Sequence, residues 1–372
     1  MPISIQPYLR EHEPAVAEFN RRLQALTHDP DLVFSQSAVP RWLPPQPGSP
    51  VWNEFFVAVD GPAVRGAYGL KQEQMFVRGK GTFNVACYHH SLAEGIVDRS
   101  YASVGALLVR DALARQPLLY VLGMGGFDRP IAKMLKALGF NLTLLPFYFR
   151  VVHPTKFLLE MQALRRHRWR AFLMNLAAIT GTGWLGIQAA QAFARRKQGA
   201  TDFVAEKVSE FSPWADDLWN VAKDSVSMAA IRDARTLSLL YPAHDQFLTR
   251  IRVKRGGRII GWAVVGERRK DSKFGAMRVG SVVDCWAPPE DAGAVVRAAA
   301  EAIEKRGVDL IVSNQAHHRW CRSFEKSGFL KGPSTFVLAL SRKLTELLEP
   351  FQQNRPSIHV TRADGDGLPK NF

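Results

Sequence analysis

The first 155 residues alternate between segments of strand-like and helix-like apolar spacing. Strand patterns place apolar side chains at every second position or in short runs, and helix patterns place them three or four residues apart. In chain order they predict strand, helix, three strands, helix, strand, helix and strand over residues 3–9, 11–26, 55–61, 63–69, 82–88, 101–114, 118–123, 131–138 and 147–152. A proline-rich loop at 40–50 interrupts the series. This half predicts an α+β domain with a mixed, mostly antiparallel sheet flanked by helices.

A second series with the same order begins after residue 200. It predicts strands and helices over 203–209, 214–222, 248–253, 258–265, 279–286, 291–306, 310–313, 318–327 and 336–340. Two copies of one topology is the economical interpretation, and two unrelated α+β domains is the alternative. The predicted organisation is an N-terminal domain at 1–155, a basic helical linker at 156–200, a C-terminal domain at 201–345 and a flexible tail at 346–372.

Charge is distributed unevenly between these parts. The chain has a formal net charge of +15, from 49 Lys and Arg against 34 Asp and Glu. Residues 156–200 hold eight basic residues and one acidic residue, which is nearly half of that excess. Two nearly balanced domains joined by a basic segment argue against a surface built to bind DNA.

The linker combines an uncharged stretch at 171–194 with basic clusters on both sides. Twenty-four residues could span a bilayer. However, polar residues dilute the stretch, Gly181-Thr182-Gly183 interrupts it, and the symmetric clusters give no orientation. Three interpretations remain: a helix pair packed between the domains, a hairpin or amphipathic segment at 165–197 on an anionic membrane surface, and a spanning helix.

Cysteine usage and the N-terminus bear on the cellular compartment. Cys87, Cys285 and Cys321 are too widely spaced for a disulfide framework or a cysteine-rich zinc site. The two adjacent histidine pairs lack the spacing that a shared metal ion needs on a helix, so no metal is predicted. The N-terminus has no positive region followed by an apolar segment. These features predict a cytoplasmic protein, with peripheral membrane association left to the linker.

The first candidate site is the turn that leads from the strand at 82–88 into the helix at 101–114. It reads Arg99-Ser100-Tyr101-Ala102-Ser103-Val104-Gly105-Ala106-Leu107-Leu108. Small side chains at the start of a helix let backbone N–H groups approach a pyrophosphate. An ordinary helix capped by Ser100 and Ser103 is the alternative.

This run resembles the signature of the GNAT-type N-acyltransferases. In that family an Arg or Gln is followed by two residues, Gly, one residue and Gly or Ala, before a Leu-rich helix. Arg99 and the Leu107-Leu108 pair match the signature, whereas Ala102 and Val104 replace the glycines. The resemblance implies a tandem GNAT-like protein, with two such domains joined by the linker.

A second element strengthens the resemblance. Residues 128–140 have the length and the Gly-Phe ending of the family's Asn-x-x-Ala-x-x-x-Tyr-x-x-x-Gly-Phe motif. Asp128 stands at the Asn, and Leu135 stands at the Tyr that often protonates the leaving thiolate. The motif returns in the second half at 314–329, again with Gly-Phe at its end.

The resemblance implies acetyl-CoA or another acyl-CoA as a substrate, bound through Arg99, Tyr101, Ala102, Ser103, Val104, Gly105 and Asp128. Amide formation also needs a base. His90 and Glu94 would share one face of an extended strand and are the candidates, while a solvated loop with incidental histidines is the alternative. In the second half, Glu290 and Asp291 at a helix start would repel a pyrophosphate, so that half is a poor acyl-CoA site.

The predicted activity is therefore an acyl-CoA-dependent N-acyltransferase. Resemblance to tandem proteins of bacterial surface polysaccharide pathways, and distantly to Fem-type peptidyltransferases, implies acetyl transfer to an amino group of a sugar or cell-surface precursor. Two alternatives stay open. One is an aminoacyl-tRNA-dependent, Fem-like transferase, and the other is a non-catalytic, membrane-associated partner of polysaccharide biosynthesis.

Overall fold

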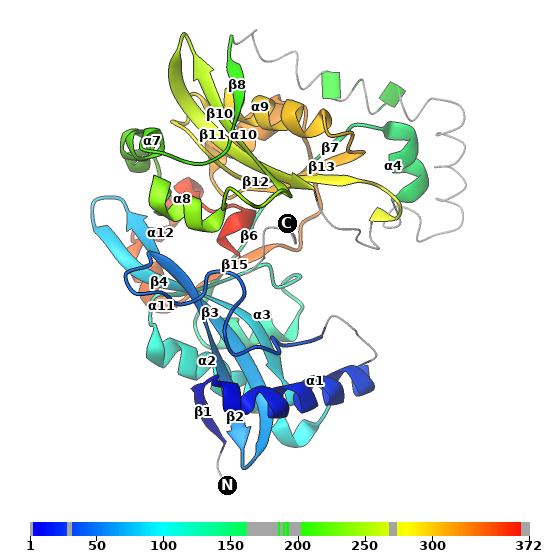
Figure 1. Ribbon diagram of the computed structural model, residues 1–372, viewed down its shortest axis with the longest axis vertical. Coiled ribbons are helices and arrows are strands. Elements are labelled where there is room, and N and C mark those ends of the chain that lie inside the picture. The colour runs from blue at the N-terminus through cyan, green and yellow to red at the C-terminus, as the bar shows by residue number, and fades with distance from the viewer. Residues whose placement is uncertain are drawn as a thin grey trace. The chain divides into compact units, whose positions relative to one another are not determined.

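The computed structural model describes residues 3–27, 32–161, 185–186, 189, 191–192, 202–267 and 274–365. They form two compact units, the first made of Met1–Leu144 with Val337–Phe351 and the second of Leu145–Phe336 with Gln352–Phe372 (Figure 1). Among the described residues, no helix is long and apolar enough to cross a membrane. The basic clusters and most of the apolar stretch predicted at 165–197 lie outside the described residues.

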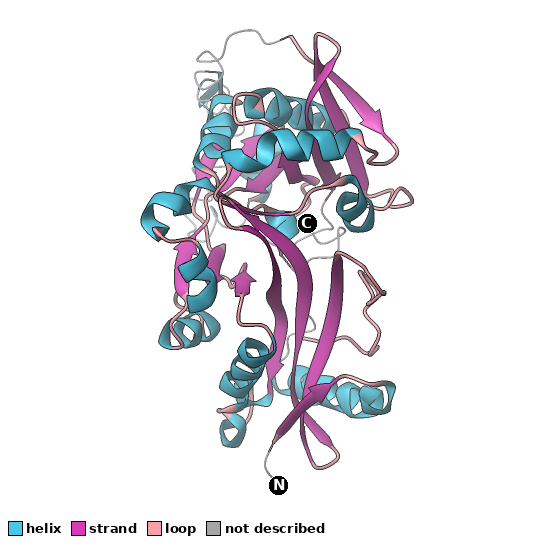
Figure 2. Ribbon diagram, turned by 90° about the vertical axis from the view of Figure 1, so that its left-hand side faces the viewer, coloured by secondary structure: helices cyan, strands magenta, loops and turns pink. Residues whose placement is uncertain are grey.

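The first unit is built on a long antiparallel meander that continues into a parallel pair. Its sheet has the order β1-β2-β3-β4-β5-β15-β6. The strands are β1 (Ser4–Pro7), β2 (Val51–Asp60), β3 (Ala63–Val77), β4 (Gly81–Ala93), β5 (Leu119–Leu122), β15 (Val337–Leu340) and β6 (Asn141–Leu144). Figure 2 shows the length and curvature of the meander strands.

Helices cover both faces of this sheet. Helices α2 (Val104–Arg115) and α3 (Pro130–Ala137) pack on Phe56 and Ala58 of β2, whereas α1 (Glu13–Thr27) packs on Val57. Neighbouring residues of a strand point to opposite faces, so α1 lies on the other side of the sheet from α2 and α3. The apolar stripe of each helix therefore packs on the apolar side chains that β2 presents to that face, as the sequence pattern predicts.

The second unit repeats the arrangement. Its sheet has the order β14-β7-β13-β12-β11-β10-β8. The strands are β14 (Leu330–Gly332), β7 (Phe147–Val151), β13 (Leu310–Asn314), β12 (Val279–Trp286), β11 (Arg258–Glu267), β10 (Leu248–Arg255) and β8 (Val204–Val208).

The helix α9 (Ala292–Glu304) packs closely on the second sheet. A Cβ atom at Gly261 of β11 would lie 2.3 Å from Val295 Cγ2, so only glycine permits this approach. The further elements of this unit are α4 (Pro154–Glu160), α7 (Trp214–Ala222), β9 (Met228–Ala230), α8 (Ala234–Leu240), α10 (His318–Lys326), α12 (Phe351–Asn354) and β16 (Ile358–His359). The predicted α+β class, with two mixed sheets flanked by helices, is confirmed.

The two sheets exchange their last predicted strands. The segment predicted to close the first half forms β7, which pairs with β13 and β14 of the second sheet. The segment predicted to close the second half forms β15, which lies between β5 and β6 of the first sheet. Both strands exist where the pattern places them, but local periodicity carries no information about the sheet that a strand joins.

The segment predicted as a flexible tail at 346–372 is ordered as far as the structure describes it, to residue 365, and that prediction is wrong there. Phe351, Ile358 and Val360 are buried apolar side chains, and His359 is 0% exposed. Apolar burial of this extent fixes the chain.

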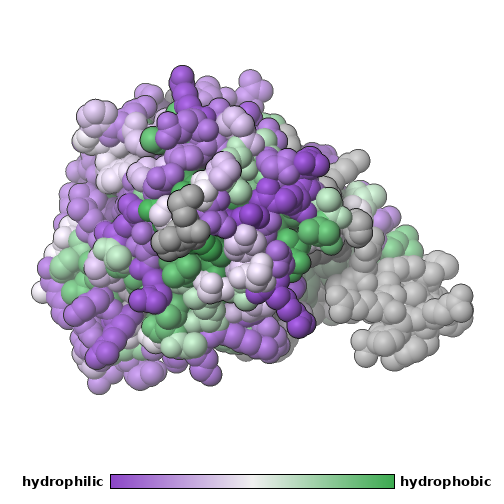
Figure 3. Space-filling view, turned by 90° about the horizontal axis from the view of Figure 1, so that it is seen from below, coloured by the Kyte–Doolittle hydropathy of each residue, from purple (hydrophilic) through white to green (hydrophobic). Residues whose placement is uncertain are grey.

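The lower face of the molecule in Figure 3 is mostly polar, with apolar groups in small clusters.

Candidate functional site

The centre of the first unit is the crossover from β4 through α2 to β5. The parallel pairing between β4 and β5 joins only Ala86 to Leu119 and Cys87 to Tyr120. Beyond these residues β4 continues along β3, while β5 continues along β15. The two strands thus diverge at their carboxyl ends, and within the described chain no hydrogen bond joins them there. Ligands of open sheets bind at such a point, outside the carboxyl ends of parallel strands.

The turn that follows β4 brings the predicted phosphate-binding residues together at the start of α2. Two short helical turns, Glu94–Ile96 and Arg99–Tyr101, precede the helix. Ser103 is the N-cap residue, and its side chain makes no hydrogen bond to the first turn of α2. Ala102 and Ser103 are exposed. The amides of Tyr101 and Ala102 already donate to Asp98 O and Arg99 O, so the amides of the turn left to face an anion are those from Ser103 onward, in the field of the helix dipole.

The remaining predicted residues take different positions around this turn. Val104 is buried, and a Cβ at Gly66 would lie 2.7 Å from its Cγ1 atom, so its side chain points into the core. The Tyr101 ring lies under the Arg65 guanidinium, 4.3 Å from its centroid, and its hydroxyl donates to Asp60. The Val104 side chain therefore does not cover the outer face of the turn, although the sequence suggests that a residue of this size would do so.

Asp128 lies on a loop that leaves the carboxyl end of β5. Asp128 is exposed, and so is Arg99 in the helical turn Arg99–Tyr101 that precedes α2. Gly123, Gly125 and Gly126 of the same loop have φ angles of 88°, 79° and 117°. Only glycine adopts such angles readily, so this loop is fixed by its composition. Three glycines within four residues are the signal of this loop in the sequence, and the apolar pattern does not reveal it.

Glu94 is held by two arginines that lie far from it in the sequence. It accepts hydrogen bonds from Arg22 Nε at 2.8 Å and Nη2 at 3.0 Å, and from Arg65 Nη1 at 3.0 Å. Burial raises the pKa of Glu94, but these hydrogen bonds outweigh burial and hold the pKa below its usual value. Such a carboxylate is a weak proton acceptor, so the geometry favours a positioning role.

His90 occupies a bulge of β4, where two residues of β4 oppose one residue of β3. Its φ angle is 51°, it is exposed, and its ring meets Phe34 edge-on. The expected alternation from His90 to Glu94 does not hold, because the bulge shifts the register and Glu94 lies beyond the end of the strand. No contact joins the two side chains in the described structure.

His89, beside it, is buried and unsuited to exchange protons with a substrate. Its Nε2 atom lies 3.1 Å from Asn53 Oδ1, and its ring fills the space above Gly69. A hydroxyl pair, Tyr88 and Ser91, lies on the same part of β4 with 2.5 Å between oxygens. The exposed group on this stretch with the chemistry of a base is therefore His90.

The second unit has the same crossover, from β12 through α9 to β13. Parallel pairing joins Val279–Ser281 to Leu310–Val312 and then stops. Here Asp291 is the N-cap residue of α9, with Glu290 before it, and Asp291 accepts a hydrogen bond from Arg255 at 2.5 Å. Asp291, like Ser103 in the first unit, makes no side-chain hydrogen bond to the first turn of its helix, so the two helix starts differ in charge and not in capping. Carboxylates beside a helix start repel a second anion there.

The whole chain is similar in fold to two solved acyltransferases. N-myristoyltransferase of Saccharomyces cerevisiae, with bound myristoyl-CoA and inhibitors, matches with a TM-score of 0.53 and 10% identity over 92% of this chain and 80% of that one. A GCN5-related N-acetyltransferase from Anabaena variabilis matches with a TM-score of 0.50 and 9% identity over 91% and 72%. The sequence matches no protein-family profile and no curated protein. The fold is thus of the GCN5-related N-acetyltransferase, or GNAT, type.

Proposed function

We propose that the protein is an acyl-CoA-dependent N-acyltransferase whose acyl-CoA site is the β4-α2-β5 crossover. The observation that carries the proposal is the uncapped start of α2, with exposed Ala102 and Ser103, at the point where β4 and β5 diverge. The amides of the helix start would bind the diphosphate of acyl-CoA. The unpaired strand edges beyond Cys87 and Tyr120 would accept the thioester arm through backbone hydrogen bonds. The solved structures of similar fold, one with bound myristoyl-CoA, support this choice of substrate.

Acyl transfer at this site forms one bond and breaks another. The amine nitrogen of the acceptor attacks the thioester carbonyl, the new C–N bond forms, and the C–S bond breaks. The amine loses a proton to a base, and the leaving thiolate gains one. His90 takes the role of the base in this proposal, because it is the exposed imidazole on the diverging part of β4. Glu94 holds the turn through Arg22 and Arg65 and does not exchange the proton.

The acceptor in this proposal is an amino group on a sugar or cell-surface precursor, as the sequence resemblance implies. Such an acceptor would meet the enzyme at an anionic membrane surface, and the basic residues between 165 and 197 would supply the attraction. Flotation with anionic liposomes tests this part separately. Loss of flotation on neutralising the four arginines at 165–170 supports it, and no flotation of either protein contradicts it.

Calorimetry with acetyl-CoA tests the site itself. Ser103→Asp places a carboxylate at the start of α2, whereas Ser103→Asn adds a side chain of the same shape without charge. Both residues are good helix caps, so both variants should fold. We expect acetyl-CoA affinity to fall at least about tenfold in the Asp variant, since like charge opposes the diphosphate, and to stay close to wild type in the Asn variant. Equal affinities in all three proteins would place the cofactor elsewhere.

A further inference from the structure

The C-terminal segment crosses the second unit's crossover as an extended chain. We call residues 356–365 the C-terminal strap. Its residues Ile358 and His359 form β16, which pairs in parallel with β9. Thr361 then pairs with Gln315 after the end of β13, and Ala316 N donates to Val360 O at 3.0 Å. The strap is therefore bound by backbone hydrogen bonds on two successive stretches.

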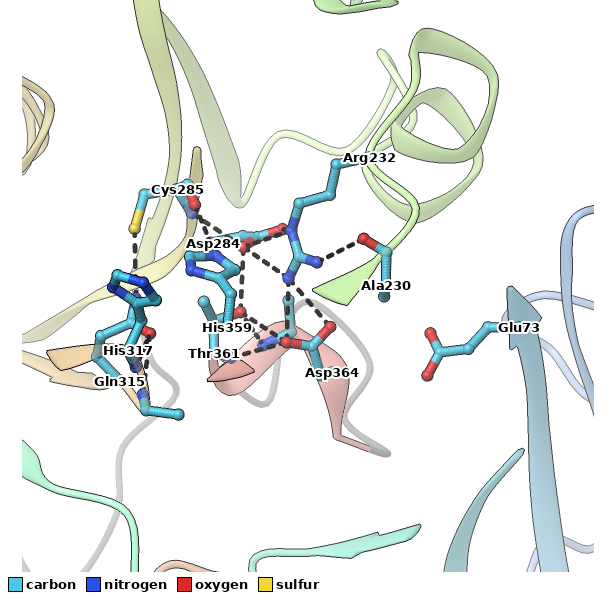
Figure 4. Close-up of polar contacts among 12 residues, drawn as sticks. Glu73, Ala230, Arg232, Asp284, Cys285, Gln315, His317, His359, Thr361 and Asp364 are labelled. Atoms are coloured by element: carbon cyan, nitrogen blue, oxygen red, sulfur yellow. Dashed lines mark hydrogen bonds and ion pairs between the residues drawn. The ribbon is translucent and has the colours of Figure 1, made fainter. Parts of the chain in front are cut away.

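The strap contacts both of the strands that diverge. On the β12 side, His359 Nε2 donates to Cys285 O at 3.1 Å, and Thr361 Oγ1 donates to Asp284 Oδ1 at 3.1 Å. On the β13 side, Arg362 Nη1 donates to Asn314 Oδ1 at 3.1 Å. Cys285 and Asn314 both lie beyond Ser281 and Val312, the last residues that pair β12 with β13. The strap thus occupies the gap between β12 and β13 (Figure 4).

A buried charge cluster fixes the far end of the strap. Arg232 lies between two carboxylates, Asp284 of β12 and Asp364 of the strap, and all three are at most 3% exposed. Arg232 Nη2 donates to both oxygens of Asp364 at 3.0 Å, and Nε donates to Asp284 Oδ2 at 3.1 Å. Asp364 also accepts from Thr361 N at 2.7 Å. Withdrawal of the strap would remove the two hydrogen bonds from buried Arg232 to Asp364 and the hydrogen bond from Thr361 to buried Asp284, which is costly.

An aromatic pocket holds the near end. The His359 ring is 0% exposed and lies edge-on to Trp286, 4.9 Å between centroids, with Trp320 at 5.7 Å. Burial, with Arg232 and His317 nearby, holds the pKa of His359 well below its usual value, so the imidazole is neutral. The carbonyl at Cys285 can only accept, which places the proton of His359 on Nε2.

We propose that the C-terminal strap permanently fills the second crossover, so that the chain binds a single acyl-CoA, at the first crossover. This inference rests on the proposed function for the identity of the ligand, but the contacts that hold the strap do not depend on it. The strap takes the position between diverging strands that the thioester arm takes in the first unit. The second GNAT-like unit is therefore a scaffold whose cofactor slot is closed by the chain itself.

The test combines binding stoichiometry with hydrogen exchange on the full chain. Acetyl-CoA is titrated into wild type and into Ser103→Asp by calorimetry, and backbone exchange at 358–364 is followed by mass spectrometry with and without acetyl-CoA. We expect one equivalent in wild type, at least tenfold weaker binding in Ser103→Asp, and slow exchange of the strap under both conditions. Two equivalents in wild type, or faster exchange of the strap on adding acetyl-CoA, overturns the proposal.

Two variants separate failure of the strap from failure of the proposed function. Asp364→Asn keeps the shape of the side chain but removes its charge beside Arg232, and we expect strap exchange to accelerate at least tenfold. Gln353→Asn, at an exposed position of α12, should leave strap exchange unchanged. If wild type binds no acetyl-CoA, the proposed function fails, while slow exchange at 358–364 still supports a filled second crossover. Exchange at the rate of a free peptide contradicts the strap whatever acetyl-CoA does.

Discussion

The two crossovers of this protein share one backbone topology and differ in what surrounds the point where their strands separate. In the first unit the helix begins after Ala102 and Ser103, and the strands diverge from Cys87 and Tyr120 onward. In the second unit the helix begins after Glu290 and Asp291, and the C-terminal strap lies between the strands. Under the proposed function, a few side chains and one segment decide which copy of the fold keeps a ligand site.

The buried charges of the two units are arranged in opposite senses. In the first unit one carboxylate, Glu94, lies between Arg22 and Arg65. In the second unit one guanidinium, Arg232, lies between Asp284 and Asp364. Arg22 also lies 3.7 Å from Glu18, and Arg65 lies 3.9 Å from Asp60, so the first cluster extends to carboxylates at its rim. The second cluster is closed around a single guanidinium that is 1% exposed.

The strongest test of this comparison removes the centre of the second cluster. Arg232→Met leaves two buried carboxylates without their shared cation, and we expect the free energy of unfolding of the second unit to fall by about 3–5 kcal/mol. Denaturant unfolding measures the change. Acetyl-CoA affinity under native conditions should stay within the error of wild type, because Arg232 belongs to the occupied crossover.

A matched, less buried arginine tests whether burial causes the expected loss of stability in Arg232→Met. Arg252 pairs with Glu206 at 2.7 Å in a partly exposed position. Arg252→Met should lower stability by less than about 1 kcal/mol. If both substitutions cost the same, the charge cluster around the strap is no more important than a surface ion pair.

A smaller effect is expected from the centre of the first cluster. Glu94→Gln removes the charge that two arginines share, and we expect a loss of about 1–3 kcal/mol in the free energy of unfolding at pH 7. The folded pKa of Glu94 lies below its usual value of 4.5. Its stabilising contribution is therefore complete above pH 4.5 and is lost as the pH falls through the folded pKa.

Denaturant unfolding of wild type and Glu94→Gln from pH 7 to pH 3, a range of about four units, measures the contribution of Glu94 to stability. The difference between the two proteins should narrow toward acid, since only wild type carries the titrating group. Glu346→Gln, at an exposed ion pair with Arg342, serves as the control and should follow wild type. A difference that widens toward acid would contradict the assigned ion pairs.

The smallest expected effect concerns the helix starts. Gly105 is the second residue of α2, and a Cβ there would lie 3.9 Å from Ala93 Cβ and Met134 Sδ, in ordinary contact. Gly105→Ala should raise the stability of the first unit by about 0.5–1 kcal/mol. It should also weaken acetyl-CoA binding, because the methyl group lies beside the amides proposed to hold the diphosphate. Gly293→Ala, at the same position of α9, should leave acetyl-CoA binding unchanged, and a loss there would remove the distinction between the crossovers.

Much of the fold follows from the sequence because apolar periodicity is a local property. The pattern at 279–286 predicts β12 to the residue, and the helix at 214–222 is found as α7 with the same bounds. The sequence also places Arg99 to Gly105 at one helix start, and the structure keeps them there. These elements are fixed by spacing over ten residues or fewer, which a sequence pattern records directly.

What the sequence could not supply depends on contacts between distant residues. Glu94 reads as a free carboxylate until the fold brings Arg22 and Arg65 to it. The C-terminal strap has no motif, and its role depends on Arg232 and Asp284, more than seventy residues earlier in the chain. The destination of β7 and β15 depends on pairing energies across whole sheets, which no local pattern encodes.

The exchange of β7 and β15 delays assembly during synthesis. The sheet of the first unit lacks its strand between β5 and β6 until Val337–Leu340 has been made. The second unit also needs residues 352–365, which are made after β15, so neither unit can finish packing before this late part of the chain is available. A chain that stops at residue 155 would carry the proposed cofactor turn on a sheet with an unfilled edge. Synthesis therefore delays a working first crossover until almost the entire polypeptide exists.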